Sequence, residues 1–93
     1  MIEGIKPLYS SQFAVYPVPN NGQFTVSMVS ADKDIFSILV YNNLGAKIYE
    51  QQGVEVQGTV EKMIDLRPIP SGIYSIVFQN QNGKVVKKIV INK

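Results

Sequence analysis

The chain has 93 residues, enough for one small domain with a single modest core. Hydrophobic residues make up 45% of it and charged residues 17%, which excludes a disordered tail. The net charge of +2 lacks the strong basic bias of a nucleic-acid-binding protein. No apolar run approaches the roughly 18 residues that a membrane-spanning helix needs, so membrane insertion is not expected.

The order of elements along the chain predicts an all-β fold. Short segments rich in Val, Ile, Phe, Tyr and Thr recur between Gly, Asn and Pro, and apolar spacing of the helical kind is hardly sustained. Residues 1–12 show little pattern and are expected to be the end of an inter-domain linker, which leaves 13–93 as the domain. The strands predicted within it are Phe13–Tyr16, Gln23–Val29, Ile35–Asn42, Lys47–Gln51, a short one at Val54–Gln57, Thr59–Leu66, Ile73–Gln79 and Val85–Asn92.

Turn chemistry separates these segments. Asn and Gly at 20–22, 42–45 and 80–83 favour hairpins, because both residues tolerate positive φ. The two prolines in 68–72 remove backbone donors, so the chain is expected to cross from one sheet to another there. These features predict a seven- to eight-stranded Greek-key, immunoglobulin-like β-sandwich.

Residues able to carry chemistry are scarce. His and Cys are both absent, which removes the commonest general base, the thiol nucleophile and the usual zinc ligands. Asp32-Lys33-Asp34 lacks the spaced acidic loop of a calcium site, and the glycines are scattered singly rather than grouped around a phosphate. We therefore expect no enzyme activity, no metal and no cofactor.

Four stretches in a fixed order are more specific than any single residue. Three of them are residues 15–26 (VYPVPNNGQFTV), 40–49 (VYNNLGAKIY) and 64–74 (IDLRPIPSGIY), and the fourth is the ending 83–93 (GKVVKKIVINK). Together they resemble the type A C-terminal sorting domain of proteins secreted by the type IX (Por) system of Bacteroidota, over Phe13 to Lys93. The family usually has Pro-Asn-Pro where this chain has Val18 between two prolines.

The resemblance implies a function in protein secretion. A larger cargo N-terminal to the domain would reach the periplasm and cross the outer membrane through the type IX translocon. A sortase-like signal peptidase would then remove the domain, leaving the cargo secreted or on the cell surface. The positions that match the family motif are Tyr16, Pro17, Pro19, Asn21, Gly22, Gly45, Pro70, Gly72 and Tyr74.

The motif residues also have expected folding roles. Pro17 and Pro19 would keep the first strand short, and Tyr74 would anchor the strand that follows it. Gly45 and Gly72 are expected where a side chain would clash. The residues predicted for translocon recognition, by β-augmentation of the last strand and by lysine charge, are Lys87, Lys88, Ile89, Val90, Ile91 and Lys93.

Two other functions stay open at this point. An immunoglobulin-like module at the cell surface could bind carbohydrate or protein, or space a neighbouring domain. A passive cap that stabilises its cargo is also compatible with the sequence.

Overall fold

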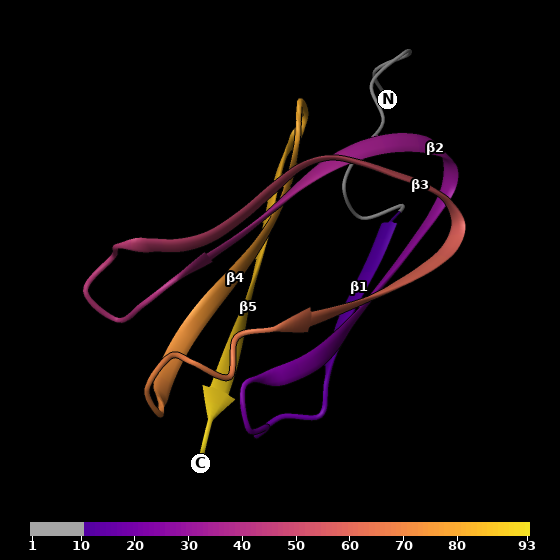
Figure 1. Ribbon diagram of the computed structural model, residues 1–93. Helices are drawn as coiled ribbons and strands as arrows, with labels where there is room; N and C mark the ends of the chain where they lie inside the picture. Colours follow the sequence, from indigo (N-terminus) through magenta and orange to yellow (C-terminus); the bar gives the residue numbers. More distant parts are fainter. Residues whose placement is uncertain (1–10) are drawn as a thin grey trace.

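The computed structural model describes residues 11–93, which form an all-β domain (Figure 1). This confirms the predicted fold class, and no helix occurs in this range. The predicted linker end, residues 1–12, lies outside the described residues except for its last two, which belong to the first strand. The strands are β1 (Ser11–Tyr16), β2 (Gln23–Tyr41), β3 (Lys47–Asp65), β4 (Gly72–Asn80) and β5 (Gly83–Ile91).

Five strands replace the predicted seven or eight, because β2 and β3 are each 19 residues long. Strand β2 contains two of the predicted segments and β3 contains three. Their antiparallel pairing continues through a register shift between Ser30 and Asp34, and Gly53 and Gly58 adopt positive φ in β3. The polar and glycine residues that suggested loops are therefore bulges, which bend a strand without ending it.

The sheet order explains how a five-stranded sheet encloses a core. β1 and the second half of β3 flank the first half of β2, whereas β4 and the first half of β3 flank its second half. β5 pairs with β4, and all these pairs are antiparallel. Since β2 and β3 bend together, the sheet curls until its two halves face each other (Figure 1). The fold is thus one curled antiparallel sheet, and a two-sheet immunoglobulin-like sandwich is not confirmed.

The core lies on the concave side of this sheet. Alternate residues of β2, such as Phe24, Val26 and Met28, are buried there, as the period of a strand requires. Phe13 of β1 joins the two halves: its ring stacks on Phe78 of β4 with centroids 4.6 Å apart, and meets Phe36 edge-on at 5.1 Å.

Candidate functional site

All four motif stretches reach the same end of the curled sheet, which we call the motif end. It comprises the loop 17–22, the turn 42–46, the loop 66–71 and the residues 92–93 that follow β5. They gather there because β2 and β3 each run away from this end, bend, and return to it (Figure 1). Residues far apart in sequence thereby become neighbours.

Asn20 is the buried polar centre of the first loop. Its side-chain Nδ2 donates to the Pro17 carbonyl at 3.0 Å, and its Oδ1 accepts from Gly22 N at 2.8 Å. Its backbone N donates to the Val90 carbonyl at 2.9 Å, and its carbonyl accepts from Asn92 N at 2.7 Å. Asn20 therefore ties the first motif to the last one, by a parallel bridge to β5. Sequence reasoning selected the neighbouring Asn21 and missed Asn20; a polar residue after the Pro-x-Pro segment was the available signal.

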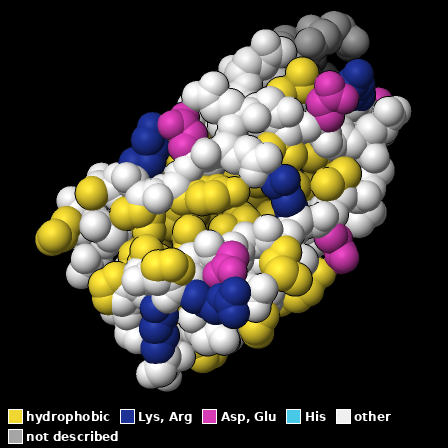
Figure 2. Space-filling model, in the orientation of Figure 1, with side chains coloured by type: hydrophobic (Ala, Val, Ile, Leu, Met, Phe, Trp, Pro, Cys, Tyr) yellow, Lys and Arg dark blue, Asp and Glu magenta, His cyan; other side chains and the backbone are white. Residues whose placement is uncertain are grey.

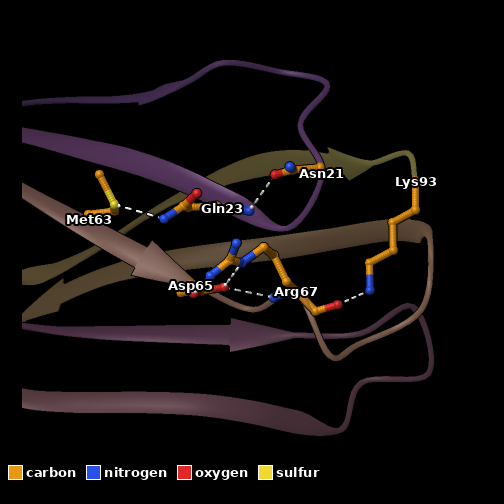
Figure 3. Close-up of polar contacts among 6 residues, drawn as sticks. All are labelled: Asn21, Gln23, Met63, Asp65, Arg67 and Lys93. Carbon is orange, nitrogen blue, oxygen red and sulfur yellow. Dashed lines mark hydrogen bonds and ion pairs between the residues drawn. The ribbon is translucent and has the colours of Figure 1, made fainter.

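Asn21 itself is exposed, and its Oδ1 accepts from Gln23 N at 3.1 Å (Figure 3). The motif residues before it are exposed as well. Tyr16 ends β1 directly before Pro17, as predicted, and its hydroxyl donates to the Glu61 carboxylate at 2.7 Å. That hydrogen bond is the main cause that raises the pKa of Tyr16 above its ordinary value.

At Gly22 the neighbouring backbone leaves no space for a side chain. Its φ is +106°, and a Cβ built there would lie 2.8 Å from Arg67 Cα and 3.0 Å from the Leu66 carbonyl oxygen. Its own carbonyl accepts from Leu66 N at 2.7 Å. At this point the first and third motifs are in main-chain contact, which only glycine permits at this position.

The loop 66–71 of the third motif also binds Lys93, which follows β5. The Lys93 ammonium donates to the Arg67 carbonyl, as Figure 3 shows, and Lys93 N donates to Ser71 Oγ at 3.0 Å. The Arg67 guanidinium pairs with Asp65 at 2.6 Å, and this contact holds the pKa of Asp65 below its ordinary value. Residues from the first, third and fourth motifs are therefore bonded into one cluster.

The turn 42–46 is built around Asn42 and Gly45. Asn42 Oδ1 accepts from Leu44 N and Ala46 N, both at 2.9 Å, and Gly45 has a φ of +85°. A Cβ on Gly45 would meet nothing within 4 Å, so the predicted clash there is wrong: the turn needs its positive φ instead. The clash predicted at Gly72 is also wrong, because the nearest atom to a Cβ would be Tyr74 Cε1 at an ordinary 3.5 Å.

Tyr74 anchors β4 to the third loop, as predicted. The residue is 6% exposed, and its hydroxyl donates to the Pro70 carbonyl at 2.7 Å. A tyrosine near the start of a strand that bonds back to the preceding connection is the arrangement of the tyrosine corner. Pro70 and Tyr74 of the motif are therefore brought together by a single hydrogen bond.

The residues predicted for translocon recognition do not share one surface. Ile89 and Ile91 are buried in the core, and the Val90 carbonyl already accepts from Asn20. Lys87 and Lys88 are exposed, but as consecutive strand residues they project from opposite faces of the sheet. Lys93 is bound to the third loop.

Part of the β5 edge is nevertheless open. Val90 O and Asn92 N point away from β4, so by strand alternation the main-chain groups of Lys84, Val86 and Lys88 do so too. Among the described residues β5 pairs only with β4 and, at its end, with Asn20. An added strand would therefore find free donors and acceptors along 84–88.

The described part of the chain offers little chemistry beyond these contacts. Within 11–93 no group of three or more His, Cys, Asp or Glu side chains could hold a metal ion. The same residues contain no helix that is long and apolar enough to cross a membrane.

Comparison with protein families finds a match to the secretion system C-terminal sorting domain over residues 14–92. Because this match spans nearly the whole chain, the chain belongs to that family, the C-terminal sorting domains of type IX secretion. No curated protein matches the chain.

Family membership fixes several broader properties. A sorting-domain family is not an enzyme family. It implies a cargo protein attached to the domain, an interaction with the type IX secretion machinery, and export of that cargo to the medium or the cell surface.

Proposed function

We propose that this domain is the signal by which the outer-membrane translocon of the type IX system accepts the cargo that precedes it. The family match over residues 14–92 is the observation that carries this proposal. Physical support comes from the motif end: the first, third and fourth motifs are bonded together there and the second lies beside the third across a pocket, so a partner meets them as one folded surface. The signal would then be conformational and would be lost when the sheet unfolds.

The open edge of β5 is the place where the translocon would add a strand. Main-chain groups at Lys84, Val86 and Lys88 are available to it, and the segment 72–93 contains four lysines and no acidic residue. Positive charge beside a free strand edge favours an extended partner that carries carboxylates. Ile89 and Ile91 support this edge from the core, without contacting the partner themselves.

Removal of the domain by a sortase-like cysteine peptidase would follow export. We place the cleavage in or before residues 1–12, and β1 supplies the reason. Phe13 packs against Phe36 and Phe78, so a peptidase acting further along the chain would have to open the folded sheet first. The N-terminus of the released domain, read by mass spectrometry, tests this; a cut beyond Phe13 contradicts it.

Export itself is tested by placing a signal peptide and a fluorescent reporter before residues 1–93 in a Bacteroidota host. The reporter should reach the medium or cell surface only when the type IX translocon is intact. Retention in the periplasm of both strains, with the domain shown to be folded, would overturn the proposed function.

A further inference from the structure

A pocket of about 260 Å³ lies at the motif end, between the turn 42–46 and the loop 66–71. Its apolar lining comes from Ile48, Ile69 and Ile73, and Tyr74 contributes to the same wall. Asn42, Asn43 and Ser71 supply polar groups. The pocket is below the roughly 300 to 1,000 Å³ of small-molecule sites, which suits a single side chain better than a cofactor.

Leu44 directly follows Asn43, which lines this pocket, and its exposed side chain contributes little to the fold. The turn uses its backbone N, but its side chain is 88% exposed. Ile73, which lines the pocket, is 53% exposed. Lone exposed apolar side chains are ordinary, whereas apolar groups gathered around a concavity mark interaction sites. Figure 2 shows hydrophobic side chains at the end of the molecule where the turn 42–46 lies, with lysine and arginine nearby.

Two lysines lie near the same region. Ile73 is directly opposite Val90 in the β4–β5 register, and Lys88 lies two residues before Val90 on the same face of the sheet. Lys93 N donates to Ser71, which lines the pocket, and the Lys93 ammonium donates to the Arg67 carbonyl, so its charge lies beside the loop 66–71. A partner with a carboxylate next to its apolar anchor would complement both lysines.

We propose that this pocket receives one apolar side chain from a protein of the secretion machinery, with Leu44 packing against that protein and acidic neighbours of the anchor facing Lys88 and Lys93. The inference rests on the proposed function, and it gives the domain a second contact with the secretion machinery in addition to the β5 edge. The concave shape favours a protein over a lipid surface, because a membrane would receive a protruding side chain and leave the pocket unfilled. A pocket that holds an anchor residue commonly dominates the affinity of an interface.

Two pairs of variants test the pocket in the reporter assay. Asn43→Trp places a large ring at the lining of the pocket, and Gln81→Trp places the same ring on an exposed residue of the β4–β5 turn. Leu44→Ser removes the exposed leucine, and Ile35→Ser removes a 53% exposed isoleucine from β2, outside both the pocket and the β5 edge. Each variant is first shown by circular dichroism to unfold at the wild-type midpoint. Asn43→Trp and Leu44→Ser should lower the exported reporter about tenfold, which corresponds to the loss of one anchor, and both controls should export normally.

The outcomes separate this inference from the proposed function. Normal export of all four variants would contradict the proposed role of the pocket and leave the sorting function intact. Equal export defects in the test variants and the controls would have the same meaning. Failure of the wild-type domain to direct export would overturn both. Binding of the isolated chain to vesicles of phosphatidylethanolamine and phosphatidylglycerol is measured alongside. If Leu44→Ser reduces that binding in step with export, Leu44 contacts lipid and the protein partner is wrong.

Discussion

Among the glycines compared at the motif end, Gly22 is the one whose substitution the structure penalises most. Its positive φ and the approach of the 66–67 backbone leave no room for a Cβ, and backbone cannot move aside as a flexible side chain can. Gly22→Ala should lower the free energy of unfolding by about 3 kcal/mol or more. Gly45→Ala is the control, because its φ is positive but its surroundings are open, and should cost about 1 to 2 kcal/mol. Equal losses in urea denaturation would contradict the close contact.

The hydroxyl of Tyr74 offers a second test of a single contact. Tyr74→Phe keeps the buried ring but leaves the Pro70 carbonyl without its partner, at a cost of about 1 kcal/mol. Tyr16→Phe is the matched control, since its hydroxyl bonds to the exposed carboxylate of Glu61 and should matter little. Thermal unfolding of the two variants distinguishes them; a larger loss in Tyr16→Phe would show that Tyr74 is not an anchor.

Asp65 gives the domain a small dependence on pH. Arg67 lowers the pKa of this carboxyl in the folded chain, so the ion pair contributes stability above the ordinary Asp pKa of 3.8 and loses it as pH falls through the folded value. Arg67→Gln should return the NMR titration midpoint of Asp65 towards 3.8. The variant should also lose less stability than the wild type as the solution is acidified below about pH 4. An unchanged midpoint would show that the pair does not persist in solution.

At the scale of elements, β5 serves both the core and the proposed recognition. Truncating the chain from Lys88 would remove the buried Ile89 and Ile91, so it tests folding rather than export. Reversing the charge of Lys87 and Lys88 to Glu leaves the core untouched, because both side chains are exposed.

The double reversal should preserve the unfolding midpoint and reduce translocon-dependent export. Reversal of Lys33, which is exposed in β2 and lies outside the proposed recognition edge, serves as the control and should have a smaller effect. Unimpaired export of the Lys87 and Lys88 variant would remove these lysines from the proposed recognition, and an equal defect at Lys33 would indicate net charge rather than position.

For the whole molecule, the curled sheet predicts one cooperative unit. The ring of Phe13 contacts Phe36 and Phe78 across the concave side, so it couples β1 to the opposite half of the sheet. Phe13→Ala should cost about 3 to 4 kcal/mol and still unfold in one transition, whereas Leu44→Ala, in the exposed turn, should cost close to nothing. Hydrogen exchange that showed β1 opening alone, well below global unfolding, would contradict this coupling.

The sequence by itself determined the all-β class, most positions of extended chain, the turns and the family. These properties are encoded within a few residues: alternation marks a strand, and Asn and Gly mark a turn. The motif order is likewise readable along the chain, as are the missing His and Cys that argued against catalysis.

Only the tertiary structure decided how these pieces are used. Whether a polar break is a loop or a bulge depends on a partner strand that continues beside it, which is why 23–41 and 47–65 became single strands. Asn20 is the buried polar residue of the loop 17–22 because Val90 reaches it from a distant part of the chain. The close backbone contact occurs at Gly22, rather than at Gly45 or Gly72, because Leu66 and Arg67 pack against it. The course of the backbone in the folded sheet also buries Ile89 and Ile91 and forms the pocket of the motif end. Contacts between residues far apart in the sequence depend on that course and not on the local sequence pattern.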